Sequence, residues 1–174
     1  AAVLDKMGKP HIEAYKKFQQ KFYAITKGMG KEQYLVPYLM SSHPGSTLKE
    51  AIDLAVFLKE NNMRPEQVQD FYPTPGTLST CMFYTGYDPY TMEEVYVPKT
   101  PEEKKMQRTL LQYFKPENKK IVISALKKAG RHDLIGYGKN CLVTPENGRN
   151  ETRAVNGRKS GKAKNNGIRK KKKR

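Results

Sequence analysis

The chain has 174 residues, about one domain in length, and its 33 basic and 17 acidic residues give a net charge of +16. It has no run of about 18 apolar residues that could cross a membrane, and its first residues lack the apolar core of a signal peptide. Its two cysteines, Cys81 and Cys141, are far apart in the sequence and fit neither a disulfide framework nor a structural zinc site. We therefore expect a reduced, cytoplasmic protein with no membrane partner and no metal site of its own.

The charge is unevenly distributed. Residues 1–144 carry 21 basic and 15 acidic residues, a net +6, whereas residues 145–174 carry 12 basic and 2 acidic residues, a net +10. This last segment is almost free of apolar side chains, so we expect a disordered tail. Its basic run, Arg169–Arg174, is compatible with non-specific binding of nucleic acid through phosphates or with a solvated tail that has no partner.

The first residues suggest that the chain is part of a longer reading frame. It begins Ala1-Ala2 and reaches a methionine only at Met7, without an initiator methionine. Removal of a methionine before Ala1 is the alternative explanation.

The first predicted element is a helix over residues 9–27, ended by Gly28 and Gly30. Apolar residues recur at spacings of three and four within it: Ile12, Tyr15, Phe18, Phe22 and Ile25. The next segment, QYLVPYLMSS at residues 33–42, is short and largely apolar, and predicts a strand buried on both faces. Its Pro37 cannot donate a ladder hydrogen bond, so we expect an edge or a bulge there.

Residues 33–77 follow a strand–helix–strand order. The sequence Thr47-Leu-Lys-Glu50 is a capping box that predicts a helix ending near residues 61–62. A second strand is expected over residues 68–72. This order predicts a βαβ unit with parallel strands.

Two turn-rich loops follow the predicted strands, SSHPGS at residues 41–46 and PTPGT at residues 73–77. Because ligands of parallel α/β folds bind at the carboxyl ends of the strands, we expect both loops to line one site. The candidate residues are Ser41, Ser42, His43, Gly45, Thr74 and Gly76.

Each candidate also has a purely structural explanation. His43 could contact a ligand or transfer a proton, or it could simply bond the backbone beside a Pro-Gly turn. The hydroxyls of Ser41 and Ser42 could bind a polar ligand or cap the following helix, and glycines in turns need no ligand.

The remainder is expected to be helical after an irregular stretch. Residues 78–99 show no helical period and predict extended structure and turns. Helices are expected over residues 100–114, with Thr100 as N-cap, and over residues 117–128, as a small helical hairpin. Residues 131–143 predict one more helical turn and a glycine-rich end.

Three stretches resemble a known family: LDKMGKP, KEQYLVPYLMSSHPGSTLKEAIDLAVFLK and RPEQVQDFYPTPGTLSTCMFYTGYDP. They are similar to the C-terminal half of the YgiQ-type radical S-adenosylmethionine (radical SAM) proteins. The later stretch EVYVPKTPEEKKMQRTLLQYFKPENKKIVISALKKAGRHDLIGYGKNCLV is similar to the small C-terminal domain of that family. The resemblance covers residues 4–143.

The resemblance implies an α/β fold, the C-terminal βαβ portion of a partial (β/α) radical SAM barrel followed by a small helical domain. Residues 1–98 would be barrel, residues 99–144 the helical domain and residues 145–174 the basic tail. Such barrels bind a [4Fe-4S] cluster through a CxxxCxxC motif, together with S-adenosyl-L-methionine, which the reduced cluster cleaves to a 5′-deoxyadenosyl radical. The motif is absent here, so we expect no cluster and no S-adenosylmethionine on this chain alone.

The first hypothesis is therefore a C-terminal segment of a radical SAM iron–sulfur enzyme of unknown substrate, inactive without the missing N-terminal half of its barrel. Its two late strands and the six candidate residues would face S-adenosylmethionine and substrate. The alternative is a non-enzymatic basic protein that binds nucleic acid or the ribosome. A third hypothesis is a degenerate family member that serves as a scaffold.

Overall fold

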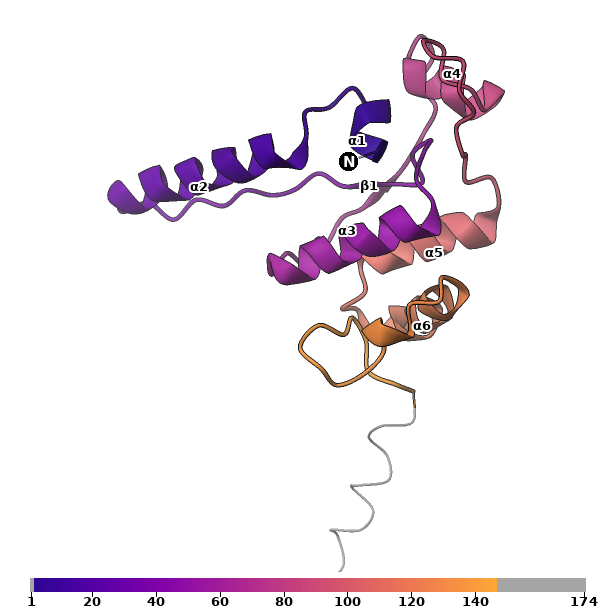
Figure 1. Cartoon of the computed structure of the whole chain (residues 1–174). Helices are drawn as coiled ribbons and strands as arrows, with labels where there is room; N and C mark the ends of the chain where they lie inside the picture. The colour runs from indigo at the N-terminus through magenta and orange to yellow at the C-terminus, as the bar shows by residue number, and fades with distance from the viewer. Residues whose placement is uncertain (1, 147–174) are drawn as a thin grey trace, which may run out of the picture.

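A computed structural model describes residues 2–146 (Figure 1). Helices alternate with two very short strands, and no helix in this part of the chain is long and apolar enough to span a membrane. The elements in chain order are α1 (Ala2–Lys6), α2 (Ile12–Gly28), β1 (Met40–Ser41), α3 (Leu48–Glu60), β2 (Gln69–Asp70), α4 (Leu78–Thr85), α5 (Pro101–Leu111), η1 (Pro116–Asn118), α6 (Lys119–Lys128) and η2 (His132–Leu134).

The predicted βαβ unit is present. Strands β1 and β2 pair in parallel, with Met40 opposite Gln69 and Ser41 opposite Asp70, and α3 connects them. Helix α3 begins where its capping box predicts: the Thr47 side chain accepts from a backbone N–H of the first turn, and the Glu50 carboxylate accepts from the Thr47 N–H. The helix ends at Glu60 with Asn61 as its C-cap, close to the expected residues 61–62.

The first strand is much shorter than predicted and is not buried on both faces. Leu39 packs against a cluster formed by Leu58 of α3, Val68 just before β2 and Leu111. The side chains of Tyr34, Val36 and Tyr38 alternate with the inward positions and are 75–88% exposed. Within the described residues, β1 pairs with β2 alone. The expectation of burial on both faces is therefore wrong for this part of the chain.

Helix α2 forms close to the predicted residues, but its apolar stripe is only partly covered. Phe18 and Ile25 are 56% and 53% exposed. Figure 1 shows the reason, because α2 extends to one side, away from the other long helices. Apolar periodicity therefore identified a helix without identifying what it packs against.

The expectation of extended structure over residues 78–99 is wrong at its start, where α4 forms. The Thr77 side chain accepts from the Thr80 N–H, and Gly86 ends the helix in the left-handed conformation, with a φ of 76°. This helix has apolar or small residues on all sides, so it lacks the amphipathic period that reveals a surface helix. The capping residues Thr77 and Gly86 were the sequence features that could have predicted this helix.

The main core lies between α3, α5 and α6, which stack side by side in Figure 1. Leu110 and Leu126 are fully buried in it against Ile52 and Ala55 of α3. The core therefore contains residues from both sides of position 98, where the sequence predicts a domain boundary. That boundary stays a prediction.

The two C-terminal helices form much as predicted, α5 after its Thr100 cap and α6 after the short helix η1. Residues 131–143 contain η2 and a glycine-rich loop closed by a bridge between Ile135 and Val143. The basic tail, predicted to be disordered, lies outside the described residues.

Candidate functional site

The loop that follows β1 is the most deeply buried polar segment of the structure. Ser41, Ser42 and His43 are each 2–3% exposed. They lie at the carboxyl end of a strand in a parallel pair, the position where α/β folds place ligands. Ser41 donates from Oγ to the Asp70 carboxylate at 2.5 Å, which ties the end of β1 to β2.

His43 connects this loop to the segment after β2. Its Nδ1 lies 2.8 Å from the Pro44 carbonyl oxygen and its Nε2 lies 2.8 Å from the Ser79 Oγ of α4. Because a carbonyl can only accept, Nδ1 carries the proton, and Nε2 accepts from the Ser79 hydroxyl. The Phe71 ring packs edge-on against the imidazole, with centroids 5.0 Å apart. Both ring nitrogens are thus engaged, and these two bonds fix the orientation of the imidazole.

Burial lowers the pKa of His43 below its usual value of 6.5, opposed by the hydrogen bond to Pro44. The folded chain therefore binds a proton at His43 less readily than the unfolded chain, and we expect the free energy of unfolding to fall as pH drops below about 6.5.

His43→Gln should reduce the fall in the free energy of unfolding between pH 7.5 and pH 5, measured by urea unfolding of the full chain. The matched variant His132→Gln, which removes an exposed imidazole, should keep it. An unchanged pH dependence in His43→Gln would contradict the assignment.

Ser42 has a strained backbone and an unused hydroxyl. Its φ is 61°, in the left-handed region that favours glycine. Its N–H donates to the Gln107 side-chain oxygen at 3.2 Å, but its Oγ is buried and has no hydrogen-bond partner within residues 2–146. The Tyr15 hydroxyl of α2 has the same property. A buried hydroxyl without a partner has lost its hydrogen bond to water, and this unmade bond has a free-energy cost that a new partner would remove.

Gly45 completes the turn under a lysine side chain. Its φ is 88°, and a Cβ there would lie 3.4 Å from Cγ of Lys6. The Gly45 N–H donates to the Tyr96 carbonyl at 2.7 Å, and the Lys6 ammonium pairs with Asp88 at 2.7 Å. Helix α1 and the segment after α4 thus both contact the loop.

The second predicted loop is more open. Thr74 and Gly76 are exposed, and the Thr74 carbonyl accepts from the hydroxyls of Thr77 and Thr80 at the start of α4. This loop connects to the first through Ser79, the partner of His43. The structure therefore packs Ser41, Ser42, His43 and Gly45 together, and leaves Thr74 and Gly76 at the surface beside them.

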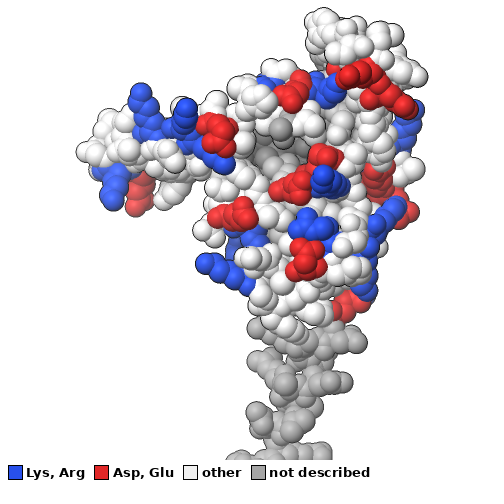
Figure 2. All heavy atoms as spheres, viewed as in Figure 1, with Lys and Arg blue, Asp and Glu red and all other residues white. Residues whose placement is uncertain are grey.

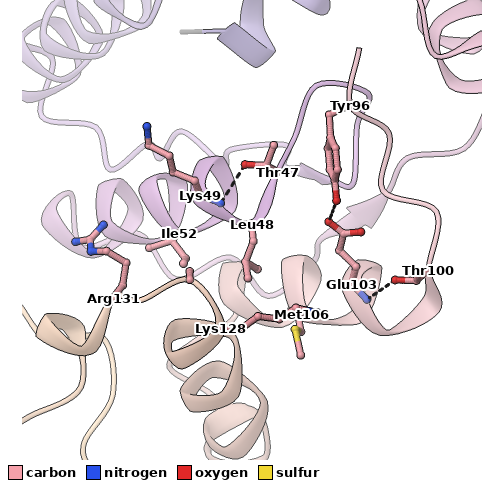
Figure 3. Close-up of a pocket in the computed structure, with 11 residues that line it drawn as sticks. Thr47, Leu48, Lys49, Ile52, Tyr96, Thr100, Glu103, Met106, Lys128 and Arg131 are labelled. Atoms are coloured by element: carbon pink, nitrogen blue, oxygen red, sulfur yellow. Dashed lines mark hydrogen bonds between the residues drawn. The ribbon is translucent and has the colours of Figure 1, made fainter. Parts of the chain in front are cut away.

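A cavity of about 650 Å³ opens between the start of α3, α5 and the end of α6 (Figure 3). Leu48, Ile52 and Met106 supply apolar surface there. The Tyr96 hydroxyl bonds the Glu103 carboxylate, and burial together with that bond raises the pKa of Tyr96 to about 12. In Figure 3 the charged ends of Lys49 and Arg131 point outward, away from the apolar side chains. The polar groups of Tyr96 and Glu103 are paired with each other, so they are already engaged within the protein.

The donor set does not fit an iron–sulfur cluster. A CxxxCxxC motif supplies three thiolates, whereas the chain has two cysteines, Cys81 on α4 and Cys141 near the end of the folded part. Within the described residues no three Cys, His, Asp or Glu side chains are grouped so as to hold a metal. On the face shown in Figure 2, basic and acidic side chains are interspersed.

Several residues that build the site were not identified from the sequence. Ser79, Phe71 and Gln107 contact the loop from positions 28–65 residues away. The capping pattern at Thr77 could have placed Ser79 at the start of a helix. No local pattern marks Gln107, because its partners are brought to it by tertiary packing.

The comparisons with known proteins identify a family. Residues 66–174 match a family described as a domain of unknown function (DUF3362). A UPF0313 protein of Clostridium perfringens strain 13 is 57% identical over 163 residues, which is 94% of this chain and 25% of the relative. A UPF0313 protein of Methanocella arvoryzae is 60% identical over 143 residues, 82% of this chain and 24% of the relative. No solved structure matches the chain.

The chain thus spans about a quarter of the length of the curated relatives that it matches. UPF0313 is the YgiQ family, so the resemblance stated from the sequence is confirmed at the level of the family. The chain belongs to the DUF3362 family, and its homologues are UPF0313 proteins, whose C-terminal region it resembles.

Proposed function

We propose that this chain supplies two late barrel strands, and the loop on the S-adenosylmethionine and substrate side, of a radical SAM enzyme of the UPF0313 family. The observation that carries the proposal is the buried loop of residues 41–46 at the carboxyl end of a parallel strand pair. Its imidazole is fixed on both nitrogens, and its Ser42 hydroxyl has no partner. In this function the Ser42 hydroxyl contacts the ligand, while His43, bonded at both nitrogens, holds the loop in place and Pro44 and Phe71 exclude water.

The uncovered face of the first strand supports the same function. Leu39 points toward the helix layer, so Tyr34, Val36 and Tyr38 point to the opposite side. In a (β/α) barrel the side opposite the helices is the interior. Residues 34–38, which are exposed in this chain, would therefore face the interior of the barrel. The rest of a full-length family member, about four times as long as this chain, would cover them.

We do not propose that this chain binds the iron–sulfur cluster, because its two cysteines cannot supply the three thiolates of the motif. The chain alone should therefore be inactive. Its contribution is to position and enclose reagents, a task that proteins perform for cofactors that carry out the chemistry.

The test uses a chimera in which this chain replaces the matching quarter of the C. perfringens relative. The chimera is reconstituted anaerobically with iron and sulfide, and 5′-deoxyadenosine is measured after addition of S-adenosylmethionine and dithionite. We expect product from the relative and from the chimera, and none from either protein truncated before the matched segment. Absence of product from the intact, cluster-loaded relative would refute the proposed function.

A further inference from the structure

Helix α5 contacts the strand-end loop through one buried amide. Gln107 is 1% exposed, and its side-chain oxygen accepts from the Ser42 N–H at 3.2 Å and the Ser46 hydroxyl at 3.0 Å. Its side-chain nitrogen donates to the Ser46 carbonyl at 2.7 Å. One side chain of α5 thus makes three hydrogen bonds to a loop some sixty residues earlier in the chain.

The neighbouring residue holds the end of the second strand. Arg108 donates from Nη1 to the Asp70 carboxylate at 2.8 Å, and the other oxygen of that carboxylate accepts from Ser41. Gln107 and Arg108 therefore fasten the ends of β1 and β2 to the same turn of α5. This turn lies within residues 66–174, the part that matches the domain of unknown function.

The loop conformation that these bonds hold is unfavourable by itself. Ser42 adopts a φ of 61°, a backbone conformation that residues other than glycine rarely adopt. Its hydroxyl is buried without a partner in the described residues. A strained residue with an unused buried hydroxyl is typical of functional sites, where the surrounding structure maintains the strain.

We propose that Gln107 is a positioning residue, and that α5 of the DUF3362 region holds the Ser42 loop in the conformation that binds S-adenosylmethionine. The proposal rests on the function proposed above, and it gives the domain of unknown function a role in ligand binding. The energy for ordering the loop is supplied before the ligand arrives, so the loop binds more tightly than a mobile one would.

Two matched variants on α5 test this role in the chimera. Gln107→Met keeps the volume of the side chain and removes its three hydrogen bonds. Gln112→Met removes the same kind of amide from the C-cap of the same helix, where it donates to the carbonyls of Pro65 and Glu66, away from the loop. Both should lower the melting temperature.

The Michaelis constant separates positioning from packing. Gln107→Met should raise the KM for S-adenosylmethionine about tenfold and leave kcat at saturation within about twofold, because the loop must then be ordered at each binding event. Gln112→Met should leave KM unchanged. Equal KM values for the two variants would overturn the proposal.

Two further readouts keep the test decisive. If Gln107→Met fails to fold, Ser46→Ala removes one of the three bonds from the loop side and should raise KM about threefold, whereas an unchanged KM would overturn the proposal. Hydrogen exchange of the Ser42 amide tests the loop without any chemistry, and it should quicken in Gln107→Met but not in Gln112→Met. Absence of product from the intact relative would refute the proposed function alone, since hydrogen exchange would still report whether Gln107 orders the loop.

Discussion

Leu110→Ala should lower the free energy of unfolding of the full chain by about 3 kcal/mol, the usual cost of a large-to-small change in a packed core. Leu110 is fully buried in α5 and belongs to the cluster that joins α3, α5 and α6. Its loss would leave a cavity where all three helices meet. Because the same helix carries Gln107, the strand-end loop should lose order in the same transition.

Urea unfolding followed by circular dichroism measures this effect. Leu78→Ala is the matched control, since Leu78 is 46% exposed on α4 and should change the free energy by less than about 1 kcal/mol. A loss below about 1 kcal/mol for Leu110→Ala would mean that the three helices do not share one core. Separate transitions in the α3 and α5–α6 regions would support instead a domain boundary near residue 98.

Ser42→Gly should raise the KM for S-adenosylmethionine about tenfold in the chimera while leaving its melting temperature unchanged or higher. Glycine accepts a φ of 61° without steric cost, so the backbone strain disappears. The change also removes the buried hydroxyl that has no partner in residues 2–146. Affinity and stability are therefore expected to move in different directions, which a general loss of folding cannot produce.

Asn62→Gly provides the control for the backbone effect. Asn62 also has a positive φ, 53°, but it is exposed at the end of α3. This variant should gain similar relief of strain and keep the KM of the unsubstituted chimera. A KM in Ser42→Gly equal to that of Asn62→Gly would show that the Ser42 hydroxyl does not contact the ligand.

Local patterns predicted the elements whose signals are local. The capping box at Thr47 placed the start of α3, and Thr100 followed by proline placed the start of α5. The order of strand, helix and strand predicted the parallel pair and placed His43 at its carboxyl end. The two caps depend on residues within a few positions of one another, and the strand pair depends on the order of three consecutive elements.

Other features depend on tertiary contacts and could not be predicted in the same way. The stripe of α2 and the outer face of residues 34–38 are apolar, yet Phe18 and Val36 are exposed in the part of the chain that the structure describes. An apolar period predicts a face but not what that face packs against. The three hydrogen bonds of the Gln107 side chain require that α5 pack against the loop between β1 and α3, and no local pattern indicates this packing. For the same reason the sequence predicted a site made of two loops, and it did not predict the hydrogen bonds that hold the first loop on α5.

Hydrogen exchange of the reconstituted chimera, with and without S-adenosylmethionine, tests the central claim most directly. The claim is that the loop of residues 41–46 is a ligand-binding segment held by α5. We expect S-adenosylmethionine to slow exchange in peptides containing Ser42 and His43, and to slow it less in Gln107→Met at the same ligand concentration. Slower exchange confined to other parts of the protein, with residues 41–46 unchanged, would contradict the claim.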